Sequence, residues 1–218
     1  MNRVARLLRK LDPWLYRYPF EGDSARRYAR LERSGFGDLD QRLVAQWHPE
    51  LQQAERFLDL GCGPATLSTL IATRYPHLQV IGAEPSREYT REQRQDVCMV
   101  RARAEGLPLA SASIDVAACI SSIRHVRDRQ AALRELRRVV RPGGTAYIVE
   151  LDPVAEPARA RQHAAGLGSR LLGLAFAPLV LATAPLGETI MEMALDAGWR
   201  TVERGDDPEQ PIYILRLR

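Results

Sequence analysis

Short apolar runs alternate with helix-length amphipathic segments through the central part of the chain, from residue 56 to residue 150. Runs of this length that are rich in Val, Ile, Leu and Ala are typical of buried strands. Strands that alternate with helices form a parallel sheet with helices on both faces. The predicted strands are Arg56–Leu60, Gln79–Ala83, Val97–Arg101, Ile114–Ile120 and Thr145–Glu150, and the predicted helices between them are Thr66–Tyr75, Arg87–Gln95 and Arg129–Val140. The last of these helices is expected to stop at a turn formed by Arg141-Pro142-Gly143-Gly144.

The pattern changes after residue 150. A long apolar segment, Ala164–Pro185, precedes a predicted helix at Gly187–Ala197. Two further strands are predicted at Thr201–Glu203 and Ile212–Leu217, with a turn-rich stretch from Gly205 to Pro208 between them. A parallel crossover needs about a dozen residues or more, so these strands should pair antiparallel. The sequence therefore predicts an α/β fold whose mostly parallel sheet is closed by a C-terminal antiparallel hairpin.

The first 50 residues follow neither of these patterns. A helix with one apolar face and basic residues off that face is predicted over residues 3–11, followed by short helices at Ser24–Ser34 and Asp40–Trp47. Half of the fourteen aromatic residues fall within the first 47 positions. We predict an N-terminal helical lid over residues 1–50 and a ligand-binding domain over residues 51–218. The aromatic residues of the front end either cover a ligand or form a small core under these helices.

Composition narrows the cellular setting. The three cysteines, Cys62, Cys98 and Cys119, are widely spaced and include no Cys-x-x-Cys pair, which favours a reducing cytoplasm over a disulfide scaffold or a zinc site. Leu171–Ala182 is too short to span a bilayer, and cationic residues interrupt the run Val4–Leu11, so neither membrane insertion nor a signal peptide is expected. The basic front end is either a solvated helix face or a site of peripheral contact with a membrane surface.

The segment Phe57–Ala65 is the strongest candidate for a binding site. It joins a strand end to Gly61 and Gly63, which lack a Cβ and let the main chain approach a ligand closely. Glu84 ends the next predicted strand, 23 residues after Gly61, and an acidic residue at about that spacing reaches ribose hydroxyls. Thr66 stands where a dinucleotide-binding loop has its third glycine, and Asp59 suits an ammonium group better than a diphosphate. The pattern favours a nucleoside with an amino-acid tail over a dinucleotide.

Residues 57–150 resemble the class I S-adenosylmethionine-dependent methyltransferases, in the order and spacing of several motifs. The matching segments are Phe57–Ala65, Gly82–Ser86, Ala102–Leu109, Ser113–Val116 with Ser122–Val126, and Arg137–Gly144; Leu195–Trp199 and the final hairpin are also similar to closing elements of that family. The resemblance implies a Rossmann-like seven-stranded sheet and S-adenosyl-L-methionine as cofactor.

The resemblance also implies roles for single residues. The methionine portion would be held by Asp59, Gly61, Gly63 and Pro64, the ribose by Glu84 and the base by Pro85. Adenine would meet Ala104 and Glu105, and the sulfonium would lie near Ser121 and Ser122. Tyr28, together with Tyr16 and Tyr18, would cover the cofactor. Arg103 departs from the family, which often has an aspartate there that accepts from the adenine amino group. Arginine cannot accept a hydrogen bond, so either the main chain does so or Arg103 points away.

Methyl transfer from a sulfonium needs a positioned acceptor, a dry site and removal of the acceptor proton. His125 is the candidate general base, because imidazole titrates near neutral pH; alternatively it only shapes the pocket. The other histidines, His48, His77 and His163, have no partner at ligand spacing, and Asp152 alone does not make a metal site. We therefore predict an enzyme that needs no metal.

The acceptor class follows from motifs that the chain lacks. After the fourth strand it has Ser121-Ser122-Ile123-Arg124, where enzymes that methylate base amines have Asn/Asp-Pro-Pro-Tyr, and it lacks the paired glutamates of arginine methyltransferases. We predict a small apolar or aromatic acceptor from natural-product, quinone or lipid metabolism, no nucleic-acid partner, and a monomer or homodimer. Residues 164–185 would cover the acceptor, form a dimer contact or simply be buried. The alternatives are a protein that binds the cofactor without methyl transfer and a dinucleotide-dependent oxidoreductase.

Overall fold

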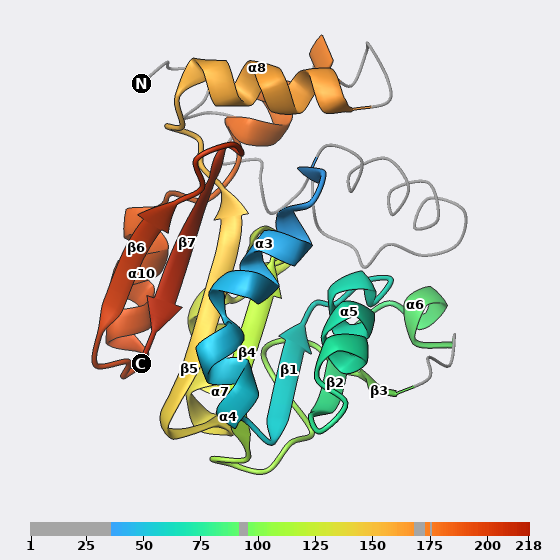
Figure 1. Ribbon diagram of the computed structural model, residues 1–218. Helices are drawn as coiled ribbons and strands as arrows, with labels where there is room; N and C mark the ends of the chain where they lie inside the picture. The colour runs from blue at the N-terminus through green and yellow to red at the C-terminus, as the bar shows by residue number, and fades with distance from the viewer. Residues whose placement is uncertain (1–35, 92–95, 168–172, 175) are drawn as a thin grey trace.

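The computed structural model describes residues 36–91, 96–167, 173–174 and 176–218. Within them a seven-stranded sheet forms the centre of the molecule, and helices cover both of its faces (Figure 1). The strands are β1 (Arg56–Leu60), β2 (Gln79–Glu84), β3 (Val97–Arg101), β4 (Ile114–Ile120), β5 (Val140–Leu151), β6 (Val202–Asp206) and β7 (Ile212–Leu217).

The order of the strands in the sheet is β3-β2-β1-β4-β5-β7-β6. The first five strands in this order run parallel to one another, and β7 lies antiparallel between β5 and β6. This arrangement confirms the predicted Rossmann-like sheet with its C-terminal antiparallel hairpin. The chain moves outward from β1 to β3 and then returns to β4, so the order reverses between β1 and β4. In open α/β sheets, ligands bind in the crevice at such a reversal, beyond the carboxyl ends of the strands.

Helices pack against both faces of the sheet. The helices are α3 (Leu39–Gln46), α4 (His48–Gln53), α5 (Thr66–Arg74), α6 (Arg87–Arg91), α7 (Arg129–Val139), α8 (Pro157–Gly166) and α10 (Gly187–Asp196), with a 3-10 turn η1 (Ile123–His125) and a short π-helix η2 (Phe176–Leu181). One apolar cluster joins α3, α4 and α5 to the sheet through Phe57, and the other joins α7 and α10 through Leu58. Neighbouring residues of a strand point to opposite faces, which is why the strands read as continuous apolar runs.

The predicted turn at Arg141–Gly144 is wrong, because these residues belong to β5. The register between β4 and β5 jumps between Ile114 and Val116, so the extra residues form a bulge in which Gly143 has φ +79°. Asp115 fixes this bulge: it accepts from Arg141 and from the N–H groups of Glu55 and Arg56. Burial raises the pKa of Asp115, but these hydrogen bonds outweigh it and hold that pKa below its usual range.

The remaining differences concern element ends and two helices that no pattern predicted. Gly205 and Asp206, expected in the turn, extend β6. The short helices α4 and α8 replace expected loops, and Pro49 and Pro157 stand in their first turns, a position where proline needs no hydrogen bond. The apolar segment Ala164–Pro185 contains the end of α8 and η2. Helix α6 is described from Arg87 to Arg91, and residues 92–95 lie outside the described residues.

The predicted N-terminal lid lies mostly outside the described residues, including the helices expected at 3–11 and 24–34 and the residues Tyr16, Tyr18 and Tyr28. The part that is described packs on the sheet: Leu39, Leu43 and Trp47 are buried in the same apolar cluster as Phe57. The division predicted after residue 50 falls inside α4.

Candidate functional site

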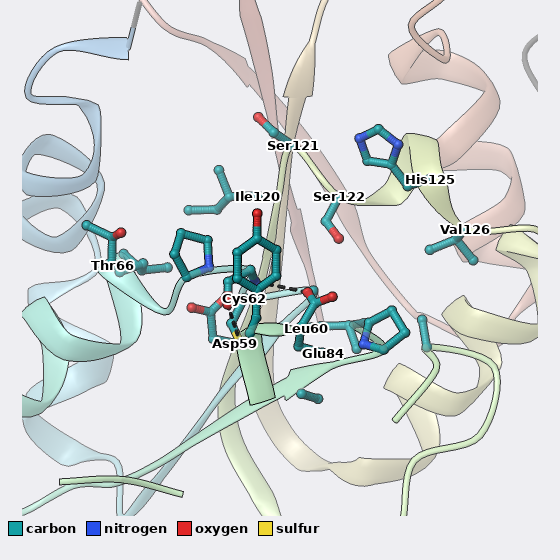
Figure 2. A pocket seen from close by; sticks show the side chains of 18 of the residues that line it. Asp59, Leu60, Cys62, Thr66, Glu84, Ile120, Ser121, Ser122, His125 and Val126 are labelled. Carbon is teal, nitrogen blue, oxygen red and sulfur yellow. Dashed lines mark hydrogen bonds between the residues drawn. The ribbon is translucent and has the colours of Figure 1, made fainter. Parts of the chain in front are cut away.

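A cavity of about 320 Å³ opens beyond the carboxyl ends of β1, β2 and β4. Its walls come from the β1–α5 loop, the end of β2, residues 102–105, the end of β4 with η1, and residues 36–40. The cavity brings together every sequence-predicted site residue that the structure describes: Asp59, Gly61, Gly63, Pro64, Glu84, Pro85, Ala104, Glu105, Ser121 and His125. Figure 2 shows Asp59 and Glu84 on one side of this space, with Ser121, Ser122 and His125 across from them.

The β1–α5 loop needs glycine at Gly61 for two reasons. Its φ is +73°, a region that residues with a side chain rarely adopt, and a Cβ there would lie 1.7 Å from Ser122 Oγ and 2.7 Å from Ser122 Cβ. The N–H of Gly61 donates to the carbonyl of Ala83 at 2.7 Å, which ties the loop to β2. Gly63 also has positive φ, +51°, but no heavy atom lies within 4 Å of the position of its Cβ. The loop is therefore closed on the Ser122 side and open at Gly63.

Glu84 connects the end of β2 to this loop. Its Oε2 accepts from the N–H of Gly63 at 3.0 Å (Figure 2). Its Oε1 accepts from the N–H of Ser86 at 2.8 Å. The carboxylate is buried, so these main-chain donors offset part of the cost of removing it from water. These two main-chain donors thus hold Glu84 in place at the cavity wall.

Asp59 is a second buried carboxylate at the cavity, and it is held by a residue that the sequence analysis did not identify. Ser68 Oγ donates to Asp59 Oδ2 at 2.6 Å. Ser68 lies on the first turns of α5 and is fully buried against β1. The only sequence signal is a small polar residue on the apolar face of a predicted helix, which usually means a specific partner.

Residues 102–105 form another wall of the cavity, and the segment from residue 102 to residue 107 is fastened to α7. Glu105 Oε1 accepts from the N–H of Asp128 at 3.3 Å, and Glu135 Oε2 accepts from the N–H of Leu107 at 2.9 Å. Hydrogen bonding from Arg138 is the main cause that lowers the pKa of Glu135, against the opposing effect of burial. Ala104 is buried, whereas the side chain of Arg103 is exposed at the rim of the cavity. Arg103 therefore borders the site without being buried in it.

The end of β4 turns sharply at Ser121. Its φ is +49°, unusual for a residue with a side chain, and its N–H donates to the carbonyl of Val149 at 2.8 Å. Ser121 Oγ is buried and has no hydrogen-bond partner among the residues that the structure describes. A buried hydroxyl at a cavity wall without a protein partner is a plain candidate for contact with a ligand.

His125 lies on η1, which follows this turn (Figure 2). Burial, together with the nearby cations of Arg124 and Arg129, lowers the pKa of His125 to about 3. The imidazole is therefore neutral at pH 7, and it is a much weaker proton acceptor than an ordinary histidine.

Three apolar or aromatic residues of the cavity wall were not identified from the sequence as site residues. Phe36 precedes α3, Tyr89 lies on α6, and Ile120 ends β4. Each looks like an ordinary core residue in the sequence, and only the topology places it at the cavity. Outside the cavity, His163 is buried between Phe36 and Phe176, with ring centroids 4.7 and 4.5 Å away. It serves as a core residue there.

The described residues offer neither a metal-binding cluster nor a membrane-spanning helix. Across the described ranges, no group of three His, Cys, Asp or Glu residues could hold a metal ion. Within the same ranges, none of the helices combines the length and apolar character needed to cross a bilayer.

Comparison with known proteins gives one family. Residues 58–148 match the family model described as a methyltransferase domain. The ubiquinone/menaquinone biosynthesis C-methyltransferase UbiE of Syntrophotalea carbinolica is 34% identical over 142 residues, which is 61% of this chain and 60% of that protein. The O-methyltransferase resE of Aspergillus sclerotiorum is 34% identical over 106 residues, or 44% of this chain and 40% of that protein. The chain thus spans less than two thirds of the length of these curated relatives.

Among solved structures, the chain resembles the plantazolicin methyltransferase BpumL, which was crystallised with a monoazolic desmethylPZN analog and SAH. The TM-score is 0.72 with 11% identity, and the match covers 100% of this chain and 99% of that one. At this identity the likeness shows the fold alone.

Proposed function

We propose that this chain, whose residues 58–148 match a methyltransferase domain, is a class I S-adenosylmethionine-dependent methyltransferase that transfers a methyl group from S-adenosyl-L-methionine to a small acceptor of apolar or aromatic character. The observation that carries the proposal is the joint presence of the glycine loop and two fixed carboxylates, Asp59 and Glu84, on one cavity at the reversal of strand order.

The residues present fit this cofactor. The open space at Gly63 lets the main chain approach a ligand, and a carboxylate at the position of Glu84 on the cavity wall suits the hydroxyls of a ribose. Asp59 lies where its negative charge favours the ammonium group of an amino-acid tail. Pro85 and Ala104 offer small apolar surfaces to a base. Tyr28, from the predicted lid, stays part of the proposed cofactor site.

The same residues speak against a dinucleotide. A diphosphate needs main-chain N–H donors and no anion nearby, but the loop faces Asp59 and Glu84 and the N–H of Gly63 is already bonded to Glu84. The structure therefore favours the adenosyl amino acid over the oxidoreductase alternative.

When bound, the cofactor supplies a methyl group on a positively charged sulfur, which needs no further activation. The chain's own part is to orient the acceptor, to exclude water and to accept a proton where the acceptor carries one. Phe36, Ile120 and Val126 supply apolar surface for exclusion of water. Ser121 Oγ can orient an acceptor by a hydrogen bond. Neutral His125 can do the same, but its lowered pKa limits it to acceptors that need little help with proton removal.

The apolar side of the cavity supports a lipophilic or aromatic acceptor. Relatives named as a quinone C-methyltransferase and as an O-methyltransferase are consistent with this class. We therefore propose an acceptor from natural-product metabolism or from quinone or lipid metabolism. The proposal includes neither a nucleic-acid partner nor a metal.

The test is transfer of a labelled methyl group from S-adenosylmethionine to a panel of quinols, phenols, thiols and amines. We expect label in at least one apolar or aromatic member. Glu84→Gln should weaken binding of S-adenosylhomocysteine at least tenfold in calorimetry, because the amide replaces an acceptor oxygen by a donor nitrogen. Glu192→Gln, at an exposed position on α10, is the matched control and should bind like the parent. Tight binding with no label in any acceptor would instead support the alternative of a cofactor-binding protein without transfer.

A further inference from the structure

The turn that carries His125 is too short to hold itself. Helix η1 has only three residues, and its internal support is limited to the N–H groups of His125 and Val126, which donate to Ser122 and Ile123. The last carbonyls of any helix lack internal donors and need partners from elsewhere. The carbonyls of Ile123 and Arg124 belong to buried residues, where the loss of a hydrogen bond would be costly; the carbonyl of Ile123 also accepts from the N–H of Val126 at 3.3 Å.

The side chain of Arg129 donates a hydrogen bond to each of these two carbonyls. Arg129 Nε donates to the carbonyl of Ile123 at 3.1 Å, and Arg129 Nη2 donates to the carbonyl of Arg124 at 2.9 Å. The planar guanidinium makes both bonds at once, so it fixes the direction of the turn as well as its distance from α7. A lysine has no such fork.

Arg129 is itself held on a fixed support. It is the first residue of α7, whose N-cap residue Asp128 accepts from the N–H of Ala131 at 2.9 Å. The N–H of Asp128 in turn donates to Glu105 on the opposite cavity wall. The start of α7 therefore holds two walls of the cavity in register.

We propose that Arg129 is a positioning residue, which clamps η1 so that His125 presents its imidazole at the cavity wall in one orientation. The role rests on the proposed function, since an oriented histidine matters there for placing the acceptor. Arg129 is absent from the cavity wall, and its guanidinium contacts η1 through the carbonyls of Ile123 and Arg124. The clamp therefore acts on the site through η1.

The charges around His125 add a second readout. Arg124 faces it from η1 and Arg129 from α7, and both disfavour the imidazolium. Glu150 on β5 pairs with Arg124 at 3.0 Å. The titratable side chains that share the cavity with His125 are Asp40, Asp59, Cys62, Glu84, Tyr89, Arg103, Glu105 and Arg127. Loss of the Arg129 charge should therefore raise the pKa of His125, while loss of the clamp alone should loosen the ring.

The experiment follows the ring signals of His125 by NMR in histidine-labelled full-length protein, assigned by their loss in His125→Gln. Arg129→Met removes charge and clamp, and Arg129→Lys keeps the charge but removes the fork. Arg134→Met, an exposed arginine on the same helix, is the matched control. Circular dichroism checks the fold of each variant.

We expect Arg129→Met to raise the titration midpoint of His125 and to broaden or multiply its ring signals. Arg129→Lys should leave the midpoint low but still broaden the signals, and Arg134→Met should match the parent in both. If Arg129→Met does not fold, the His125 ring signals of Arg129→Lys alone test the clamp. Parent-like ring signals in Arg129→Lys would overturn the clamp, even if the midpoint moves in Arg129→Met. Because these signals are read in the protein without cofactor, they are independent of whether S-adenosylhomocysteine binds, which tests the proposed function separately.

Discussion

At the scale of single residues, Gly61 shows how one position serves both conformation and space. Its positive φ would cost a side-chain-bearing residue about 1–2 kcal/mol. The overlap with Ser122 adds to this cost, because both the Oγ and the Cβ of that serine lie too close. The loop therefore depends on the absence of a single carbon atom.

Gly61→Ala should lower the free energy of unfolding by about 2 kcal/mol or more and weaken binding of S-adenosylhomocysteine, since the loop and Ser122 must separate. Denaturant unfolding and calorimetry measure both effects. Gly63→Ala introduces backbone strain but no steric overlap, so it should lower the free energy of unfolding less than Gly61→Ala does. The double variant Gly61→Ala/Ser122→Gly should recover part of the loss. If Gly61→Ala matches the parent in both measurements, the proposed closure of the loop on Ser122 is wrong.

His125 makes a second residue-scale prediction, which concerns pH. Its pKa is about 3 in the folded protein against an ordinary value of 6.5, so between these values the unfolded chain binds more protons. The stability that this provides is complete above pH 6.5 and declines as the pH falls toward 3. Between pH 7.5 and pH 5, His125 alone should reduce the free energy of unfolding by about 2 kcal/mol.

His125→Gln removes this dependence and should lose less stability than the parent over the same pH interval. Burial also lowers the pKa of His163, so that residue contributes with the same sign in both proteins and cancels from the comparison. Unfolding curves at the two pH values provide the measurement. Identical pH dependence in the two proteins would show that His125 titrates normally.

At the scale of elements, a buried ion pair connects three segments around the cavity. Arg124 Nε donates to Glu150 Oε1 at 3.0 Å, and Arg124 Nη1 donates to the carbonyl of Val180 at 3.2 Å. The pair thereby links η1, the end of β5 and η2. Burial leaves the side chains of both ions almost without solvent contact, with exposed fractions of 3% and 0%.

Replacing one ion of the Arg124–Glu150 pair should lower the free energy of unfolding far more than replacing both ions. Arg124→Met leaves Glu150 buried without its cation and should cost about 3–5 kcal/mol, whereas Arg124→Met/Glu150→Leu should cost less than the sum of the single changes. A double-mutant cycle by chemical denaturation measures the coupling. Additive costs would mean that the two ions do not interact in solution.

The elements also show what sequence patterns can and cannot predict. The strands β1, β3, β4 and β7 were predicted with the bounds that the structure has, because each is a short run rich in apolar residues. The bulge at Gly143 could not be predicted, since a glycine pair after a helix also suits a turn. In the site, spacing was enough to place Gly61 and Glu84. Ser68 and Arg129 depend on contacts between elements that no spacing reveals.

At the scale of the whole molecule, the start of the described chain is joined to its end. Trp47 stacks on Tyr147 of β5 at 4.5 Å between ring centroids. Arg42 on α3 pairs with Asp207 at 3.1 Å, and Glu50 on α4 pairs with Arg216 on β7. Helices α3 and α4 therefore form part of the same core as the sheet, whatever the role of residues 1–35 as a lid.

Trp47→Ala should accordingly destabilise the protein by about 3–5 kcal/mol, because it opens a cavity against the sheet. Trp47 does not line the binding cavity, so the affinity for S-adenosylhomocysteine below the melting transition should change little. Thermal unfolding and calorimetry separate the two effects. A variant that keeps the parent's stability would show that residues 36–50 form a separate unit.

The proposed function depends on what the cavity beyond β1, β2 and β4 binds. Titration calorimetry of the unmodified protein tests this most directly. S-adenosylhomocysteine should bind with one site per chain, and NADH at the same concentrations should give no heat. Heat from NADH with none from S-adenosylhomocysteine, or no heat from either S-adenosylmethionine or S-adenosylhomocysteine at saturating levels, would contradict the proposed function.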